Sequence, residues 1–561
     1  MPAPASVNDI DLSPRPGKTY FSSPREWREE FIYFLMVDRF HDDQARTPPA
    51  GTGRTIGVAT TNDFYGGTIK GITNNLAYIA GLGCTAIWLS PVLACNSYHG
   101  YDTRNYLDVD SRFGTKQDLV DLADATHARG MRIIMDVVIN HSGDNWQYKG
   151  GSKGYHNDDR YEFDAFRPGR EIVPTELRDP DCYHRRGDMG NYDSYPENQH
   201  GDMTGLKDYA NDDDAIGSLV INALIKSYCY WIREADIDGF RVDAVKHMGE
   251  LACARFCSSI REYAYTLGKR RFFLFGELAR PDDDIYDRYI GPNTSIQDGN
   301  HTVFFGIDSL LDFRLAAGVY NQVPRLRQII RGDVGPEPLF NRLEAQRNRA
   351  LNRGELGRYL VTFVDNHDGF WQKGEGRIGL GASAEQIVGA IGYLLCSLGT
   401  PCIYYGTEQG FEGNASEDFL LREGMFDKAT PGMNLLNTNC DIYKAISAIA
   451  AVVRDQEPLL FGRMYFRQIS GDGVTFGLPY GTKYTLAFSR LLYGREVLVG
   501  YNVSSASRSD RVVVDADLHK PGDKMTYLHP KSKGDVTIEK GANGTTFVRL
   551  ELDGNQFAIL E

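Results

Sequence analysis

Residues 236–247 read DIDGFRVDAVKH and combine the pattern of a buried strand with two charged side chains. The segment 239–244 is apolar enough for a short buried strand. Because side chains alternate along a strand, Arg241 and Asp243 fall on one face and Phe240 and Val242 on the other. The guanidinium would keep Asp243 ionised, as a carboxylate nucleophile must be. A buried structural ion pair explains this stretch equally well when it is taken alone.

Apolar strands recur along the chain and alternate with helical patterns. The predicted strands are Phe31–Val37, Cys84–Val92, Met131–Val138, Gly239–Ala244, Phe272–Phe275, Ser309–Phe313, Tyr359–Val364 and Cys402–Tyr405. Helical patterns lie between most of them, including Ile72–Gly81, Ala215–Glu234, Cys253–Leu267 and Ala384–Leu398. About eight strand–helix repeats predict an α/β fold, a (β/α)8 TIM barrel.

Two stretches break the strand–helix alternation. Residues 143–214 are rich in Gly, Asp, Tyr and Asn, and they are too long for a strand-to-helix loop, so they predict a small inserted domain after strand three. From about Phe461 onward, short alternating strands separated by turn residues predict an antiparallel β-sandwich. The predicted domains are residues 1–142 and 215–460 for the barrel, 143–214 for the insertion and 461–561 for the C-terminal domain.

The composition is that of an ordinary globular protein, with 561 residues of which 42% are apolar and 24% charged. The net charge of −14 argues against nucleic acid and anionic membrane as partners. The sequence contains no run of 18 or more apolar residues, so no membrane span is predicted. The N-terminus lacks the pattern of a signal peptide. The nine cysteines show no disulfide framework. We expect a cytoplasmic protein, with a mature secreted form as the alternative.

Polar side chains follow four of the predicted strands. They occur in the segments 136–141 (DVVINH), 241–243 (RVD), 276–277 (GE) and 365–368 (DNHD). A single acid after a strand commonly caps the next helix. Four such groups at one rim instead predict an active site, because catalytic groups in this fold come from the C-terminal ends of several strands.

Two carboxylates, one ionised and one protonated, are the groups that cleave a glycosidic bond. Asp243 beside Arg241 suits the ionised nucleophile. Glu277 has no cation beside it in the sequence, so burial would favour its protonated form and an acid/base role. Asp368 would stabilise positive charge on the sugar ring in the transition state.

His141 and His367 can donate hydrogen bonds to sugar hydroxyls. Two other classes of protein are alternatives. A barrel metalloenzyme would use these histidines with Asp136, but the three show no recognisable metal spacing. A barrel that has become a non-catalytic binding protein should have lost a catalytic carboxylate, and Asp243, Glu277 and Asp368 are all present.

Four segments resemble, in order and spacing, the signature segments of glycoside hydrolase family 13, the α-amylase family. These are DVVINH (136–141), GFRVDAVKH (239–247), FGE (275–277) and FVDNHD (363–368), and the resemblance extends over about residues 30–561. The resemblance implies a retaining mechanism on α-linked glucose, with Asp243 as nucleophile, Glu277 as acid/base and Asp368 as stabiliser. It also implies that the reacting sugar is bound by His141, Arg241 and His367.

The segment HGYD (99–102) resembles the family's loop after strand two. The resemblance implies that Tyr101 stacks on the reacting ring and that Asp102 binds its hydroxyls; a loop-anchoring role is the alternative for Tyr101. The sequence departs from the family where Trp371 stands in place of an arginine that many relatives carry after segment four. Which residue binds the non-reducing side of the substrate is therefore open.

No cofactor is required for this chemistry, and the resemblance raises the question of a structural calcium ion. Asn140 and the backbone of His247 match ligands of the family's calcium site. The fifth segment, read as MTGLK (203–207), places Gly205 where the ligating carboxylate should be. Because calcium needs six or more oxygens, this loss argues against the ion. Asp42 matches a metal ligand of some relatives, with a solvated acidic loop as the alternative.

We therefore expect a retaining α-glucosidic hydrolase that acts on malto-oligosaccharides or related α-1,4-glucans. The alternative is a transglycosylase or isomerase that uses the same covalent intermediate on short α-glucosides. The expected partner is the oligosaccharide substrate, without nucleic acid or membrane.

Overall fold

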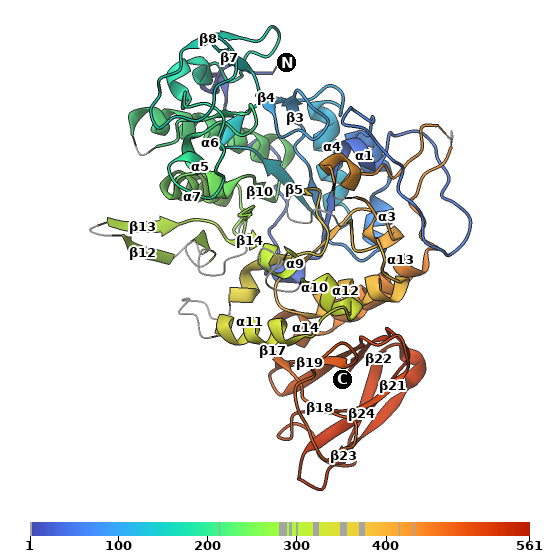
Figure 1. Cartoon of the computed structure of the whole chain (residues 1–561). Coiled ribbons are helices and arrows are strands. Elements are labelled where there is room, and N and C mark those ends of the chain that lie inside the picture. Colours follow the sequence, from blue (N-terminus) through green and yellow to red (C-terminus); the bar gives the residue numbers. More distant parts are fainter. Residues whose placement is uncertain are drawn as a thin grey trace.

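Eight parallel strands close into a barrel in the computed structural model (Figure 1). The described residues are 3–212, 214–279, 286, 289–290, 294–298, 301–317, 325–347, 356–369, 376–414, 416–429 and 432–561. The barrel strands are β1 (Ile32–Leu35), β2 (Ala86–Leu89), β5 (Arg132–Val137), β10 (Gly239–Val242), β11 (Phe273–Gly276), β14 (Ser309–Leu311), β15 (Leu360–Thr362) and β16 (Thr400–Tyr404). Each lies beside its neighbour in sequence order, and β16 pairs with β1. The predicted barrel is confirmed.

The register between β5, β10 and β11 brings the charged side chains together. Asp136 on β5 lies directly opposite Arg241 on β10. Gly239 allows the close approach of β10 to β11, since a Cβ there would lie 2.8 Å from the carbonyl oxygen of Phe273. The four residues of β10 are all buried, so an arginine in this strand requires acidic partners.

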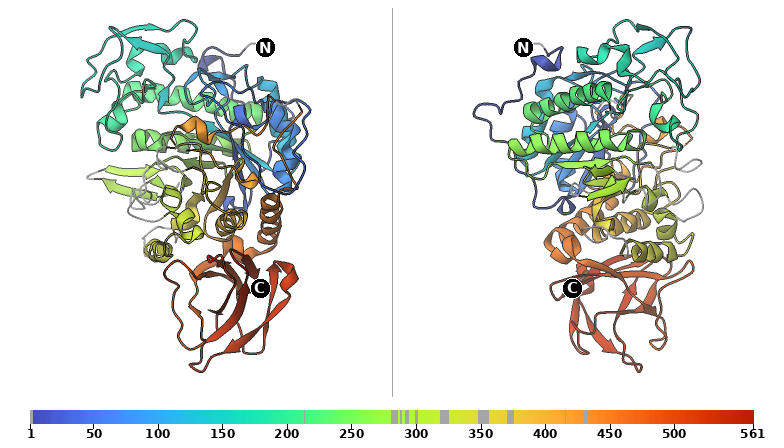
Figure 2. Two further views of the ribbon diagram at one scale, coloured as in Figure 1. Left: turned by 45° about the vertical axis from the view of Figure 1, so that its right-hand side comes forward. Right: turned by 90° about the vertical axis from the view of Figure 1, so that its left-hand side faces the viewer.

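Helices surround the barrel (Figure 1). They are α1 (Val37–Phe40), α2 (Ile69–Asn74), α3 (Leu76–Gly81), α4 (Lys116–His127), α6 (Ala215–Ala235), α7 (Glu250–Thr266), α9 (Phe313–Ala317), α10 (Leu326–Arg331), α11 (Glu337–Arg347), α12 (Ala384–Cys396), α13 (Asp441–Asp455) and α14 (Glu457–Phe461). By length and composition α6 could cross a membrane, but 61% of its most apolar window is buried inside the protein. It lies beside α7 (Figure 2), as a helix of the barrel layer does.

The stretch predicted as an insertion contains small sheets and short helices, and the loop after β2 adds another sheet. The elements are β3 (Leu93–Cys95), β4 (Thr103–Val109), β6 (His141–Ser142), β7 (Trp146–Tyr148), β8 (Phe163–Phe166), α5 (Glu197–His200) and β9 (Lys207–Asp208). The pairing of β6 with β9 places His141 opposite Asp208 and so joins the two ends of the segment. A further hairpin, β12 (Thr294–Asp298) with β13 (His301–Phe305), lies between β11 and β14 and was not predicted.

Nine antiparallel strands form the C-terminal domain, drawn in red in Figure 1. They are β17 (Arg463–Phe466), β18 (Ile469–Ser470), β19 (Thr485–Leu492), β20 (Arg495–Asn502), β21 (Arg508–Val513), β22 (Lys524–His529), β23 (Asp535–Lys540), β24 (Thr546–Leu552) and β25 (Phe557–Leu560). They enclose their own core, which includes Leu498 and Val548. Arg490 anchors the domain to the barrel by donating to the carbonyl oxygen of Cys396 at 2.7 Å. All nine cysteines of the chain are buried and unpaired.

Candidate active site

Arg241 lies at the centre of a buried carboxylate cluster formed by the ends of β5, β10 and β11. Its Nη1 donates to Asp243 Oδ1 at 2.5 Å and to Asp136 Oδ1 at 3.0 Å. Its Nη2 lies 3.2 Å from Glu277 Oε2. The backbone N–H of Ala244 also donates to Glu277 Oε2, at 3.1 Å. One guanidinium therefore holds three carboxylates at one rim of the barrel.

The cluster carries more negative than positive charge, and burial disfavours that excess. Burial raises the pKa of Asp136 to about 6, against the opposing effect of Arg241. Burial also raises the pKa of Asp243. Arg241 opposes this shift, and Glu277 adds to it. Glu277 has no cation beside it in the sequence, but in the fold Arg241 reaches it from the adjacent strand β10. Burial is therefore the main cause that favours retention of a proton, and repulsion from Glu277 and Asp136 adds to it at Asp243.

Asp136 orients two aromatic side chains as well as Arg241. Its Oδ2 accepts hydrogen bonds from Tyr101 at 2.9 Å and from Trp88 Nε1 at 3.1 Å. Tyr101 also stacks on His367, with ring centroids 5.3 Å apart. The hydroxyl of Tyr101 therefore anchors its loop and its ring lies at the site, whereas its stacking on the sugar stays a prediction.

Two histidines at this rim are neutral donors or acceptors. Burial lowers the pKa of His141 to about 4 and the pKa of His367 well below its usual value. His141 Nε2 donates to the carbonyl oxygen of Tyr101 at 3.2 Å, and its Nδ1 is buried with no hydrogen-bond partner. Asp102, by contrast, turns into its own loop. Its Oδ1 accepts from the Ser97 hydroxyl at 2.7 Å and from two backbone N–H groups.

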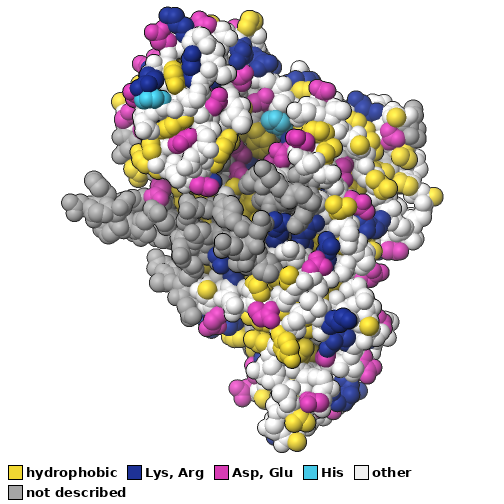
Figure 3. Space-filling view, viewed as in Figure 1, with side chains coloured by type: hydrophobic (Ala, Val, Ile, Leu, Met, Phe, Trp, Pro, Cys, Tyr) yellow, Lys and Arg dark blue, Asp and Glu magenta, His cyan; other side chains and the backbone are white. Residues whose placement is uncertain are grey.

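A second guanidinium, that of Arg422, holds the third predicted carboxylate. Arg422 Nη2 lies 3.2 Å from Asp368 Oδ1, and its Nε donates to the carbonyl oxygen of His367 at 2.9 Å. This arginine follows β16, and no sequence pattern places it beside Asp368. Trp371 lies outside the described residues. On the face shown in Figure 3, acidic and hydrophobic side chains gather in a hollow below the inserted segment.

The carboxylate beside Asn140 belongs to Asp208, so the reading of Gly205 as its position was wrong. Asn140 Nδ2 donates to Asp208 Oδ1 at 3.2 Å. Asn140 Oδ1 is buried and has no hydrogen-bond partner. An amide oxygen without a partner beside a carboxylate fits a hard cation such as calcium. The misreading arose because the fifth segment, LKDYA at 206–210, was placed three residues too early.

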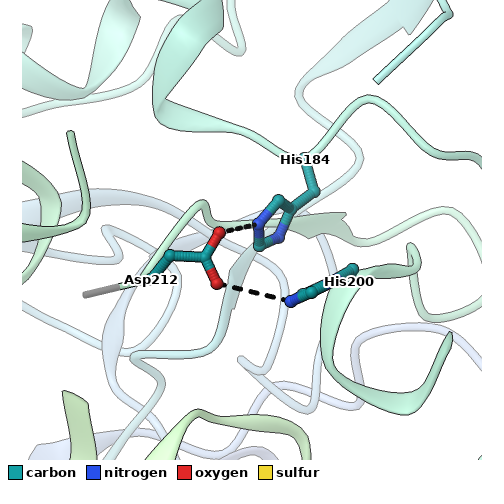
Figure 4. A group of neighbouring side chains, drawn as sticks. All are labelled: His184, His200 and Asp212. Atoms are coloured by element: carbon teal, nitrogen blue, oxygen red, sulfur yellow. Dashed lines mark hydrogen bonds and ion pairs between the residues drawn. The ribbon is translucent and has the colours of Figure 1, made fainter. Parts of the chain in front are cut away.

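Asp208 also contacts His184, which forms a network with Asp212 and His200 (Figure 4). His184 Nδ1 lies 2.7 Å from Asp208 and its Nε2 lies 2.9 Å from Asp212. Burial opposes the charge on His184, but both carboxylates outweigh it and raise its pKa to about 9. His200 Nδ1 accepts from Arg186, so its Nε2 carries the proton that faces Asp212. The ring nitrogens that a transition metal would use therefore carry protons.

The other metal candidate, Asp42, lies in a salt bridge. Its Oδ2 pairs with Arg46 Nη2 at 2.5 Å, and its Oδ1 accepts from Arg46 Nε at 2.8 Å. Thr68, in the same loop, caps α2 by accepting from the backbone N–H of Gly71. These contacts argue against the metal role predicted for Asp42.

Comparisons with known proteins point to one family. The family model described as "Alpha amylase, catalytic domain" matches residues 34–432. An α-amylase from Streptomyces lividans is 28% identical over 87% of this chain, and a cyclomaltodextrin glucanotransferase from Thermoanaerobacterium thermosulfurigenes is 25% identical, also over 87%. The chain spans 58% and 62% of the length of these two relatives.

Solved structures share the fold along nearly the whole chain. The crystal structure of an α-amylase from Geobacillus thermoleovorans, complexed with acarbose, superposes with a TM-score of 0.69 at 23% identity and covers 96% of this chain and 99% of that one. The match of the family model over most of the barrel, together with the carboxylates at its rim, shows that the chain belongs to the α-amylase family.

Proposed function

We propose that this protein is a retaining α-glucosidic hydrolase that acts on malto-oligosaccharides or related α-1,4-glucans. The observation that carries the proposal is the contact of Arg241 with Asp243, Glu277 and Asp136 at the barrel rim. A retaining glycosidase needs a nucleophile and an acid/base on either side of one bond. Three ordered carboxylates that share one cation supply both groups.

The reaction proceeds by two displacements at the anomeric carbon. Asp243 attacks that carbon as Glu277 protonates the departing glycosidic oxygen, which forms a covalent glycosyl–enzyme ester. Glu277 then takes a proton from water, whose oxygen attacks the same carbon and releases Asp243. Asp368 stabilises the positive charge that develops on the ring. Arg241 orients the nucleophile, and Tyr101 limits the position of the ring.

A transglycosylase is the second candidate, because one relative is a cyclomaltodextrin glucanotransferase. It would form the same ester and differ only in the acceptor, a sugar hydroxyl in place of water. The experiment is a product profile with maltose, maltotriose, maltoheptaose, cyclodextrin, sucrose and soluble starch. Shorter α-anomeric products support the hydrolase, and longer or isomerised products support the transglycosylase. No reaction with any of them would contradict both.

Arg422 is proposed to position Asp368. We expect Arg422→Lys to lower kcat by about 10²-fold with little change in KM, because a lysine cannot contact Asp368, His367 and Tyr98 together. Steady-state kinetics and the melting temperature would be measured together. The control is Asp418→Asn, which removes a half-exposed carboxylate 3.7 Å from Arg422. A parallel fall in stability and in both kinetic constants would mean a structural role only.

Asn140 and Asp208 are proposed to hold a structural calcium ion, which would fix the inserted segment on the barrel and take no part in the chemistry. We expect calcium to raise the melting temperature of chelator-treated protein by a few degrees, since an ion present at 100 times its Kd adds about 2.7 kcal/mol. Asp208→Asn should abolish the response and Asp42→Asn should keep it. A melting temperature that does not change when calcium is added would contradict the proposal.

A further inference from the structure

A cavity of about 390 Å³ opens at the face of the barrel opposite to the carboxylate cluster. Its walls come from the N-terminal ends of β11, β14 and β16, from the residues just before β1 and β15, and from the end of α7 and the loop that follows it. The lining residues are Glu26, Trp27, Arg28, Arg261, Arg270, Arg271, Phe272, Phe273, Asp308, Ser309, Arg358, Tyr359 and Thr400. We call this cavity the arginine pocket.

Positive charge exceeds negative charge in the arginine pocket, although the whole chain carries a net charge of −14. Its two carboxylates already have partners. Glu26 pairs with Arg271 at 2.7 Å, and Asp308 pairs with Arg261 at 3.0 Å. Among the described residues, Arg28 has no ion pair, and the same holds for Arg270.

The charge of Arg28 is only partly balanced by its surroundings. Arg28 is half-buried, and burial lowers the pKa of its guanidinium; Glu26 opposes this shift and Arg358 adds to it. Repulsion between two arginines is relieved when an anion lies between them. Arg28 also lies 4.8 Å from the ring centroid of Phe461, a weak contact that leaves its N–H donors available.

Ser309 adds a second, independent indication of a ligand. It lines the pocket, is 3% exposed, and its hydroxyl has no hydrogen-bond partner among the described residues. A buried hydroxyl without a partner is unfavourable unless a ligand satisfies it. Trp27 and Phe273, stacked with ring centroids 4.5 Å apart, form an apolar wall.

We propose that the arginine pocket binds a phosphomonoester of the size of a hexose phosphate. Phosphate oxygens accept several charge-assisted hydrogen bonds, which arginines in different orientations supply. The aromatic wall suits the body that carries the phosphate, and the volume is within the usual range for small-ligand sites. Arg28 and Arg270 would bind the phosphate, and Ser309 would donate to one of its oxygens.

The test is isothermal titration calorimetry of the full chain with inorganic phosphate, glucose 1-phosphate, glucose 6-phosphate, AMP and glucose. We expect the phosphate compounds to bind and glucose not to bind. Tighter binding of a hexose phosphate than of AMP or inorganic phosphate supports the proposed size. Absence of heat with every phosphate compound overturns the proposal, as does equal binding of glucose.

Variants locate the binding in the pocket. Arg28→Met and Arg270→Met should each weaken binding by about tenfold, whereas Arg129→Met, an exposed arginine at the end of α4, should not. Ser309→Ala should weaken it by about threefold without lowering the melting temperature, because its hydroxyl has no partner to lose. Asp368→Asn should leave phosphate binding unchanged. Unchanged binding in the three pocket variants overturns the proposal. Calorimetry needs no turnover, so this result is independent of the proposed activity.

Discussion

Asp243→Asn should lower kcat on maltotriose by about 10⁴- to 10⁶-fold, because an amide cannot form the glycosyl ester. The fold should survive the change, since Arg241 keeps its contacts with Asp136 and Glu277. The melting temperature should stay the same or rise, because the substitution removes one negative charge from a crowded buried cluster. Catalytic groups often lower the stability of the fold in this way.

The role of Asp243 can be tested further with a second nucleophile. In Asp243→Ala, azide can enter the space of the lost carboxylate and attack an α-glycosyl fluoride. One displacement inverts the anomeric centre and two retain it. We therefore expect a β-glycosyl azide as the product. Near-normal turnover of Asp243→Asn, or an α-azide from Asp243→Ala, would show that another group is the nucleophile.

Glu277→Gln should lower kcat on malto-oligosaccharides by about 10³-fold, because the glutamine cannot protonate the departing oxygen. An α-glycosyl fluoride needs no such proton, so its first displacement should fall by less than about tenfold. Attack by water should remain slow, since it needs the same residue as base. The ester on Asp243 should therefore accumulate in this variant.

Mass spectrometry of the denatured variant would detect that ester, located by peptide mapping. Asp243→Asn serves as the matched control, because it should show no glycosyl adduct with the same fluoride. The two variants are thus expected to respond in opposite ways to an activated substrate. If Glu277→Gln were slowed equally on the fluoride and on maltotriose, Glu277 would not be the acid.

The barrel could be predicted because its strands are local features. Each is a short apolar run bounded by turn residues. Because both faces of such a strand are buried, nearly all of its residues are apolar. The hairpin β12–β13 was missed; it lies in the connection between β11 and β14, for which no element was predicted. The ends of strands were predicted less well than their existence; β10, for example, stops at Val242.

The candidate site was predictable only where a reactive side chain directly follows a predicted strand. Asp243, Glu277 and Asp368 follow strands directly, so the topology of a barrel places them at one rim. Arg422 lies more than fifty residues from Asp368 along the chain and meets it only in three dimensions. Arg241 and Glu277 likewise meet only through the pairing of β10 with β11. The error over Gly205 was one of alignment, which the pairing of β6 with β9 resolves.

The pairing of His141 with Asp208 has a consequence for how such enzymes diversify. The ends of the inserted segment already touch, so a change in its length adds little loop-closure entropy. The inserted segment can therefore change in length while the barrel stays the same. His141, a residue proposed to bind the reacting sugar, lies where the two ends of the segment meet.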